Sequence, residues 1–277
     1  MLVPDLRNPI YGALLAGISG RLERDGYTAI IFETRSEEDR MTKALRVLDE
    51  RRVEGAINAA ARATDRRRLA QFIRKGVPMV LAARDVPGLK VPRVLNDDWK
   101  GGALAAEHLL SLGHRRIAQI TGPTDVVSFL ERAQGFRSTV ANAGAALRVH
   151  DAEASIGTVE EGRRVMRTVL RRHELPTAIF AHNDLLAIGA MAALREVNLD
   201  CPGDVSIVGY NGEPLTEYLD PPLTTVLFPA EQLGHVAAET VLSMLCGTEP
   251  RFAVALQPQL IVRQSTAEAP RPKRQTG

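Results

Sequence analysis

The stretch PTAIFAHNDLLAIGAMAALREVNLDCPGDVSIVGYN, residues 176–211, contains two short apolar segments separated by one helical segment. Strands are predicted at 178–181 and 205–210, and the helix between them is predicted to begin just after Asn183-Asp184. In an open α/β sheet, ligands bind beyond the carboxyl ends of the strands, where the chain turns into helices. We therefore predict that this stretch forms one wall of a ligand-binding cleft.

The same alternation of strand and helix recurs along the chain. Amphipathic helices end at Gly26, Gly76 and Gly113, and an apolar strand is predicted after each glycine, at 28–32, 78–82 and 117–121. The left-handed position just after a helix favours glycine, because a Cβ would clash there. Strands that alternate with helices predict a parallel sheet with right-handed crossovers, and continuous apolar strands suit a sheet that is covered on both faces.

The number of strand–helix repeats predicts two sheets. About four repeats precede residue 97 and about four more lie between residues 100 and 228, which is too many for one comfortable sheet. A polar break at 94–98 separates the two groups. We therefore predict an α/β fold made of two similar, doubly wound parallel-sheet lobes.

The composition is that of an ordinary soluble globular protein, with 277 residues, 45% apolar and 25% charged. A net charge of +2 gives no strong attraction to DNA or to a membrane surface. No apolar run approaches the roughly 20 residues of a membrane span, and the start of the chain has no signal-peptide pattern. Because no signal-peptide pattern is present, we expect a cytoplasmic location. Cys201 and Cys246 have no metal-ligand spacing, so we expect two free thiols and no metal site. We also expect no cofactor.

Several longer motifs follow one another in order along the chain. They include VPDLRNPIY at 3–11, NDDWKGG at 96–102, HLLSLGHRRIAQITGP at 108–123, PTAIFAHNDLLAIGA at 176–190 and LIVRQST at 260–266. In this order and at this spacing, the motifs resemble the effector-binding domain of the LacI/GalR family of bacterial transcription regulators. The resemblance extends over the whole chain except the last dozen residues.

The resemblance implies a periplasmic-binding-protein-like fold, in which a three-segment hinge joins two lobes and a small effector binds between them. On this basis the N-terminal lobe comprises 1–98 and 229–255, and the C-terminal lobe comprises 99–228 and 256–265. Residues 266–277 lack core-forming side chains, and we predict a disordered tail there.

The resemblance also implies partners. Members of the family dimerise through this domain and bind operator DNA with an N-terminal helix-turn-helix, so we expect a homodimer that represses or regulates transcription. No helix-turn-helix pattern precedes Pro4, and the first strand is clipped to Met1–Val3. Operator DNA is therefore expected as a partner only through a missing N-terminal head, which suggests a shortened chain or a mis-assigned start codon.

Three residues of the N-terminal lobe are expected to bind the ligand: Asn8, Tyr11 and Arg84. Asn8 precedes Pro9 and suits a helix cap equally well, and Tyr11 would either stack on a ligand ring or pack in the core. Arg84 follows the strand at 79–83, where a guanidinium group suits a hydroxyl-rich or anionic ligand. The alternative for Arg84 is a solvated loop arginine.

In the C-terminal lobe, Ser128 and Arg132 lie at the beginning of a helix and are expected to bind the ligand. Arg132 matches the arginine of a family motif, here ERAQGF at 131–136, and its alternative role is an internal salt bridge. Asn183 is expected to form hydrogen bonds with ligand hydroxyl groups. The neighbouring Asp184 is predicted to be the N-cap of the following helix.

Two further ligand-binding residues, Asn211 and Phe228, depart from the family pattern. The family usually has Asp at the position of Asn211 and a second Asp at Gly212, and many members have Gln where Phe228 stands. Gly157 stands where relatives that bind bulky ligands often have an aromatic residue. These departures warn against assigning the effector of any one relative to this chain.

The lost carboxylates suggest a ligand class. Because Arg84 and Arg132 remain while those carboxylates are absent, the cleft is predicted to be positively charged. This pattern leads to the hypothesis of a sugar or polyol derivative that carries a carboxylate or a phosphate.

Two other classes of function compete with this interpretation. The sequence has no GxSxG elbow, no GxGxxG after a strand, no Walker loop and no HExxH, so we expect no enzyme, although His182 lies beside Asn183-Asp184. A solute-binding protein of a sugar transporter would share the fold but would need export. The motifs GHRRIA, PPLTTV and LIVRQST favour the regulators.

Overall fold

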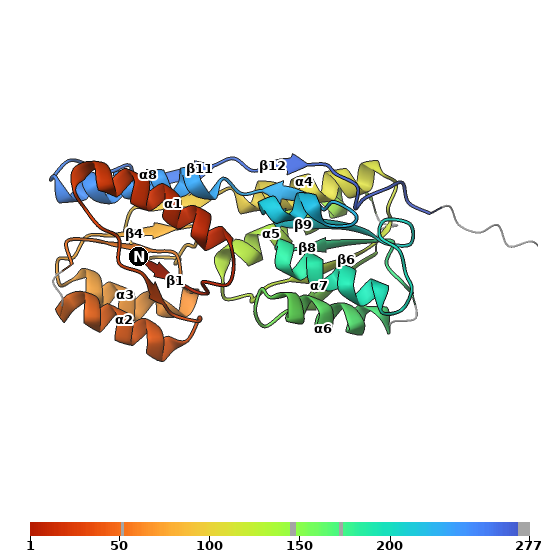
Figure 1. Cartoon of the computed structure of the whole chain (residues 1–277), viewed down its shortest axis with the longest axis horizontal. Coiled ribbons are helices and arrows are strands. Elements are labelled where there is room, and N and C mark those ends of the chain that lie inside the picture. Colours follow the sequence, from red (N-terminus) through yellow and green to blue (C-terminus); the bar gives the residue numbers. More distant parts are fainter. Residues whose placement is uncertain (51–52, 145–147, 172–173, 271–277) are drawn as a thin grey trace, which may run out of the picture. The chain divides into compact units, whose positions relative to one another are not determined.

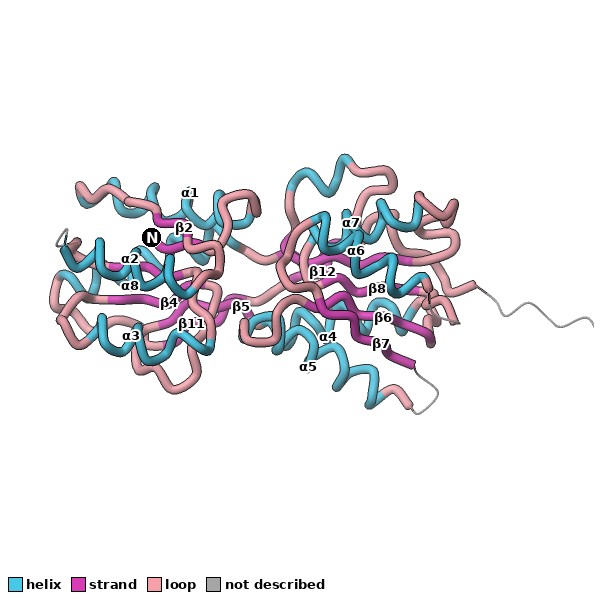
Figure 2. The backbone as a smooth tube through the Cα atoms, turned by 90° about the horizontal axis from the view of Figure 1, so that it is seen from below, coloured by secondary structure: helices cyan, strands magenta, loops and turns pink. Residues whose placement is uncertain are grey.

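The computed structural model describes residues 1–50, 53–144, 148–171 and 174–270 (Figure 1). The chain divides into two compact units. Unit 1 comprises Met1–Asp97, Asp125–Ser128 and Pro229–Gln257, and unit 2 comprises Asp98–Thr124, Phe129–Phe228 and the chain from Pro258 onward. Each unit contains one six-stranded sheet that is flanked by helices, as Figure 2 shows. The predicted α/β class with two mainly parallel sheets is therefore confirmed.

The sheet of unit 1 is parallel throughout, in the order β11-β5-β4-β3-β1-β2. Its strands are β1 (Leu2–Val3), β2 (Phe32–Glu33), β3 (Ala56–Asn58), β4 (Met79–Ala82), β5 (Arg93–Asn96) and β11 (Ala253–Leu256). Helices α1 (Ile10–Leu22) and α8 (Ala230–Leu245) lie on one face, and α2 (Glu38–Glu50) and α3 (Arg66–Ile73) lie on the other (Figure 1). Unit 1 also contains two short 3-10 helices, η1 (Glu23–Asp25) and η2 (Ala63–Asp65).

The two faces of this sheet are covered in different ways. Apolar side chains of α2 and α3, among them Leu48 and Phe72, form a core with the sheet residues Leu2 and Leu81. On the other face α1 and α8 approach each other closely at Gly17, where a Cβ would lie 1.9 Å from a backbone oxygen of α8. A larger residue at Gly17 would push these two helices apart.

The sheet of unit 2 has the order β12-β10-β9-β8-β6-β7 and is parallel except for β12, which is antiparallel to β10. Its strands are β6 (Arg116–Thr121), β7 (Arg148–Glu153), β8 (Ala178–Ala181), β9 (Ser206–Asn211), β10 (Thr224–Leu227) and β12 (Gln259–Ile261). Its helices are α4 (Asp98–Ser111), α5 (Val127–Asn142), α6 (Val159–Leu170), α7 (Asp184–Arg195) and the 3-10 helix η3 (Pro214–Tyr218). Figure 2 shows α6 and α7 on one face of this sheet and α4 and α5 on the other.

The glycine pattern that defines the helix ends has the expected backbone geometry. Gly26 and Gly113 have φ angles of 77° and 83°, in the left-handed region that side chains with a Cβ adopt rarely. This geometry lets each helix stop and the chain turn toward the next strand.

Strand β2 is shorter than the sequence predicts. The run 28–32 is predicted as a strand, but pairing is confined to Phe32 and Glu33. The reason is the neighbouring strand, because β1 pairs with β2 only through Leu2 and Val3. The prediction of a full strand at 28–32 is therefore wrong in length.

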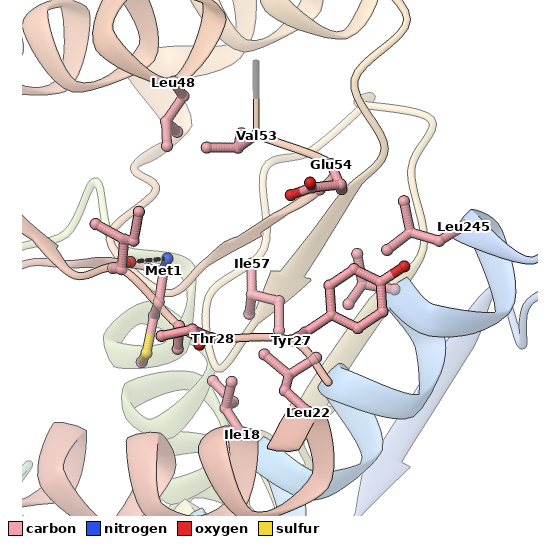
Figure 3. Close-up of a pocket in the computed structure, with 14 residues that line it drawn as sticks. Met1, Ile18, Leu22, Tyr27, Thr28, Leu48, Val53, Glu54, Ile57 and Leu245 are labelled. Carbon is pink, nitrogen blue, oxygen red and sulfur yellow. Dashed lines mark hydrogen bonds between the residues drawn. The ribbon is translucent and has the colours of Figure 1, made fainter. Parts of the chain in front are cut away.

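A pocket opens in unit 1 beside the start of β1 (Figure 3). It encloses about 640 Å³ of empty space, part of which is open solvent, and apolar side chains such as Ile18 and Leu245 line it. The backbone nitrogen of Met1 donates a hydrogen bond to the carbonyl oxygen of Ile30 at 2.6 Å. The pocket lies where β1 begins, whereas ligands of open α/β sheets bind beyond the carboxyl ends of the strands. It is therefore not the expected ligand site.

The end of the chain is held against unit 2 as far as it is described. The backbone N–H of Ala267 donates to the hydroxyl of Ser206 at 3.0 Å, and that of Ala269 donates to the carbonyl of Leu112 at 2.8 Å. The rest of the predicted disordered tail, residues 271–277, lies outside the described residues.

Two features of the fold bear on location and redox chemistry. No helix in the described ranges is long and apolar enough to cross a membrane. Cys201 and Cys246 are free thiols, as the sequence predicts. Burial raises the pKa of the Cys201 thiol to about 12, so this thiol stays protonated and unreactive at neutral pH.

Candidate functional site

Polar side chains gather at the carboxyl ends of the strands of unit 1. Asn58 is the last residue of β3, Asn96 is the last residue of β5, and Arg84 follows β4. Asn8 and Tyr11 follow β1 at the start of α1. The carboxyl ends of parallel strands share one edge of a sheet, so these residues belong to one edge of unit 1.

The side chain of Asn8 forms a hydrogen bond at the start of the first helix of unit 1, where Pro9 is the N-cap residue. The Asn8 side-chain oxygen accepts a hydrogen bond from the backbone N–H of Ile10 at 3.2 Å, and its carbonyl accepts one from Tyr11. A side-chain oxygen in this position satisfies one of the N–H groups that a helix start leaves without a partner. Asn8 therefore supports the helix start from the position before the N-cap, and its contact with a ligand stays a prediction.

Tyr11 and Arg84 are brought together. Arg84 donates a hydrogen bond from Nη2 to the Tyr11 hydroxyl oxygen at 3.2 Å and another from Nη1 to the carbonyl of Ala60 at 3.4 Å. Only 8% of the Arg84 surface is exposed. The alternative of a solvated loop arginine is therefore wrong, because the strand end and Tyr11 enclose the guanidinium group.

The backbone at Arg84 is held in an uncommon conformation. Ala83 has a φ of 62°, which is rare for a residue with a Cβ, and the N–H of Arg84 donates to the carbonyl of Ala82 at 2.7 Å. Residues held in sparsely populated conformations cluster at functional sites, where the surrounding structure maintains them. The turn fixes the point from which the Arg84 side chain extends.

Asn58 is a candidate that the sequence analysis missed. Its side-chain oxygen accepts the N–H of Ala60 at 2.9 Å, and Ala60 in turn accepts from Arg84 through its carbonyl. Asn58 is fully buried, and within the described part of the chain its Nδ2 has no hydrogen-bond partner. The available signal was a polar residue at the end of an otherwise apolar strand, AIN at 56–58.

Arg132 lies in a closed cage inside unit 2. Its Nε donates to a carboxylate oxygen of Asp98 at 2.8 Å, and its Nη1 donates to the carbonyl of His182 at 2.5 Å. The guanidinium carbon lies 3.7 Å from the ring centre of Tyr210 and 5.2 Å from that of Phe129. Of the two roles that the sequence leaves open for Arg132, the internal salt bridge is the one observed.

The cage balances its own charge. Burial lowers the pKa of Arg132, but the carboxylate of Asp98 and the hydroxyl of Tyr210 outweigh this effect, so the pKa is raised. The Tyr210 hydroxyl donates to the same Asp98 oxygen at 2.7 Å, and burial, followed by the negative charge of Asp98, raises the pKa of Tyr210 well above its usual range. The predicted positive charge of the cleft therefore cannot rest on Arg132.

Asn183, not Asp184, is the N-cap of α7, so the predicted role of Asp184 is wrong. The Asn183 side-chain oxygen accepts the backbone N–H of Leu186 at 2.7 Å, and its Nδ2 donates to the carbonyl of Gly157 at 3.0 Å. A Cβ at Gly157 would lie 2.3 Å from that Nδ2, which explains the glycine at this position. One N–H and one lone pair of the Asn183 amide remain for a ligand.

Asp184 is a buried carboxylate that fixes the end of β9. It accepts hydrogen bonds from the Thr225 hydroxyl at 2.7 Å and from the backbone N–H of Glu213 at 2.8 Å. Burial raises its pKa to about 7, although these two hydrogen bonds act in the opposite direction. A Cβ at Gly209 would lie 2.3 Å from a carboxylate oxygen of Asp184, so glycine is needed there.

Asn211 and Phe228 meet at the carboxyl ends of β9 and β10. The N–H of Phe228 donates to the carbonyl of Asn211 at 3.1 Å. Asn211 has a φ of 122°, and the next residue, Gly212, has a φ of 72° and donates its N–H to the Thr225 hydroxyl. Asparagine tolerates such backbone angles better than most residues with a Cβ.

Ser128 and His182 complete the buried set. Ser128 is buried in the first turn of α5, in the segment that groups with unit 1. His182 Nε2 forms a hydrogen bond with the side-chain oxygen of Gln119 at 3.0 Å, while the Gln119 amide nitrogen donates to Asp151. Burial, and then the positive charge of Arg132, lowers the pKa of His182 well below its usual range, so this imidazole is neutral.

The chemistry of these residues is that of binding. In the described ranges, no group of three or more His, Cys, Asp and Glu side chains is placed to hold a metal ion. Amides, hydroxyls and a guanidinium group at strand ends are groups that can bind a ligand by hydrogen bonding and charge.

The comparison with known sequences gives one consistent family. A model of the periplasmic binding protein-like domain matches residues 106–266. The HTH-type transcriptional regulator MalR of Streptomyces coelicolor is 35% identical over 282 residues, which cover 98% of this chain and 80% of that protein.

Solved structures with bound sugars are also similar. A LacI family transcriptional regulator from Enterococcus faecium, with bound ribose, has a TM-score of 0.85 and 29% identity, covering 97% of this chain and 98% of that chain. The complex of the transcriptional regulator CelR with cellobiose has a TM-score of 0.86 and 29% identity, covering 95% of this chain and 83% of that chain.

Proposed function

Because this chain belongs to the LacI family of transcriptional regulators and forms their effector-binding domain, we propose that it binds a small-molecule effector between its two units. The observation that carries the proposal is the match to a transcriptional regulator along 98% of the chain. Two structurally similar regulators hold ribose and cellobiose. A sugar or a sugar derivative is therefore our proposed effector class.

Eight residues form the proposed site, and they act in two ways. Arg132 supports the site by holding the carbonyl of His182, next to Asn183. Asn183 offers its remaining N–H and lone pair to the ligand. The other proposed ligand-binding residues are Asn8, Tyr11, Arg84, Ser128, Asn211 and Phe228. His182, which precedes Asn183 in the chain, is buried and hydrogen-bonded to Gln119, so we assign it a structural role.

The proposed output is a change in operator binding. An effector that binds one arrangement of the two units more tightly than another shifts the population toward that arrangement. In a homodimer, such a shift would change the spacing of helix-turn-helix heads carried ahead of this domain, and those heads need half-sites at a fixed spacing. The coupling is expected to be about 1–3 kcal/mol. Operator binding places the proposed site of action in the cytoplasm.

A ligand screen tests this proposal. The purified chain is unfolded thermally with sugars, polyols, sugar acids, sugar phosphates and nucleobases, and each hit is measured by calorimetry. A ligand at 100 times its dissociation constant stabilises the folded state by about 2.7 kcal/mol, so one chemical class should give a saturable shift. Saturable binding of nucleobases alone would contradict a sugar effector. If no compound of the panel shifted the Tm, the result would count against the proposed ligand site.

Matched tyrosine variants connect such a hit to the site. Tyr11→Ala removes a buried ring in the first turn of α1, near the carboxyl ends of the strands of unit 1. Tyr218→Ala removes a ring of unit 2 that is 80% exposed. We expect the first variant to weaken binding about tenfold or more and the second to leave it unchanged. Equal affinities in the two variants would exclude Tyr11 from the site.

A further inference from the structure

The guanidinium group of Arg84 is buried without a matching negative charge. Its two hydrogen-bond acceptors are neutral, the Tyr11 hydroxyl at 3.2 Å and the Ala60 carbonyl at 3.4 Å, and both distances are long. Within the described ranges, no carboxylate forms an ion pair with Arg84. The adjacent Asp85 is engaged elsewhere, because it accepts the N–H of Val86 and faces Arg93 at 3.9 Å.

A buried cation in this state is costly, and proteins usually pair or neutralise such a charge. Arg132 in unit 2 shows the usual solution, since Asp98 lies 2.8 Å from its Nε. A guanidinium group keeps its proton in proteins, so loss of a proton does not relieve this cost. A negative group supplied from outside the chain would therefore stabilise Arg84.

The groups around Arg84 are hydrogen-bond donors. The Tyr11 oxygen accepts from Arg84, which leaves the hydroxyl hydrogen to be donated to another group. Asn58 uses its oxygen on the N–H of Ala60, while its buried Nδ2 has no hydrogen-bond partner in the described part of the chain. Ala60 joins the two side chains, because its N–H binds Asn58 and its carbonyl binds Arg84.

We propose that Arg84, Tyr11 and Asn58 form a subsite for an oxyanion group, a carboxylate or a phosphate, on the effector. A cation beside two further donors matches the acceptor oxygens of such a group. The inference rests on the proposed function for the hydroxyl-bearing remainder of the ligand. The subsite itself needs unit 1 alone and can be tested with simple anions.

The test uses inorganic phosphate and acetate as probes of the two possible anion sources. The full chain is unfolded thermally in increasing phosphate or acetate, against chloride of equal ionic strength. We expect a saturable rise in Tm of about 2 °C or more with one of the anions. Arg84→Gln should abolish the rise, and Arg46→Gln, which changes an exposed arginine of α2, should retain it. An equal response of wild type and Arg84→Gln would overturn the subsite.

Matched ligand pairs separate this inference from the proposed function. Calorimetry compares glucose with glucuronate and glucose 6-phosphate, and ribose with ribose 5-phosphate. We expect the charged member to bind at least about tenfold more tightly in wild type, and Arg84→Gln to remove most of that preference. If the neutral and the charged sugar of a pair bound with equal affinity, the oxyanion subsite would be wrong, whereas the sugar-binding function would be supported. An Arg84-dependent response to phosphate without any sugar binding would sustain the subsite and count against the sugar.

Discussion

Arg84 and Arg132 are both buried, with 8% and 5% of their surfaces exposed. The two guanidinium groups nevertheless have different kinds of partner. Arg132 forms an ion pair with Asp98, donates to a carbonyl and lies over the ring of Tyr210. Arg84 donates to a hydroxyl and a carbonyl, and both hydrogen bonds are long. The partners of a buried arginine, and not its burial, therefore distinguish a structural role from a role in ligand recognition.

The largest expected effect comes from breaking the closed cage. Arg132→Gln leaves Asp98 buried without its ion-pair partner, which typically costs about 3–5 kcal/mol of unfolding free energy. Urea denaturation measures the loss. The exposed Arg46→Gln is the control and should change the unfolding free energy by less than about 0.5 kcal/mol. A loss below about 1 kcal/mol in Arg132→Gln would remove the structural role assigned to the cage.

The buried carboxyl group of Asp184 makes the stability of unit 2 depend on pH. The ordinary pKa of Asp184 is 3.8, and burial raises it to about 7 in the folded state. Between these values the folded protein keeps a proton that the unfolded chain releases, so the unfolding free energy falls as the pH rises. From pH 5 to pH 8 this contribution is roughly 2 kcal/mol.

Asp184→Asn isolates that contribution. The variant should be less stable than wild type at pH 5, because its amide NH2 replaces one of the two oxygens that accept hydrogen bonds from Thr225 and from the N–H of Glu213. The difference between the two proteins should then shrink as the pH rises to 8, since only wild type carries the carboxylate. Denaturation curves at several pH values measure it. Parallel stability profiles for the two proteins would contradict the raised pKa.

A smaller change tests the wall of the cage. Tyr210→Phe keeps the ring beside Arg132 but removes the hydroxyl that donates to Asp98 at 2.7 Å. A hydrogen bond to a charged group is worth about 1.5–3 kcal/mol, and we expect a loss at the lower end because Arg132 still binds Asp98. Thermal or urea unfolding checks this value. An unchanged stability would show that the hydroxyl contributes nothing to the cage.

The smallest stability effect is expected at Arg84. Arg84→Gln removes two long hydrogen bonds together with a buried charge that has no ion-pair partner among the described residues. These losses and gains oppose each other, so the unfolding free energy should change by less than about 1 kcal/mol in either direction. Urea denaturation in an anion-free buffer measures it. A loss as large as that of Arg132→Gln would erase the contrast between the two arginines.

Much of the fold follows from local sequence signals. The helix-ending glycines, including Gly113, predict where the chain turns back, and continuous apolar runs predict the buried strands. The direction of β12 was not predictable, because an isolated short strand carries no signal for parallel or antiparallel pairing. The length of β2 depends on its neighbour β1, which local propensity does not report.

The site was less predictable, because its roles depend on partners far apart in the chain. Arg132 and Asp98 are separated by 34 positions, and no spacing rule connects them. Asn183 and Asp184 are both good capping residues, and the burial of Asp184 against Thr225 decides between them. The case for Asn58 needs the structure, because among the described residues its amide nitrogen has no hydrogen-bond partner and its oxygen binds Ala60, which also binds Arg84.

The two buried arginines differ in the anion that pairs with them: Asp98 pairs with Arg132, and an oxyanion of the effector is the proposed partner of Arg84. This difference is tested by measuring the Tm of wild type, Arg84→Gln and Tyr210→Phe at increasing phosphate concentration. We expect a saturable rise in Tm for wild type and for Tyr210→Phe, from a lower starting Tm in the latter, and no rise for Arg84→Gln. A rise that persists in Arg84→Gln and disappears in Tyr210→Phe would contradict it.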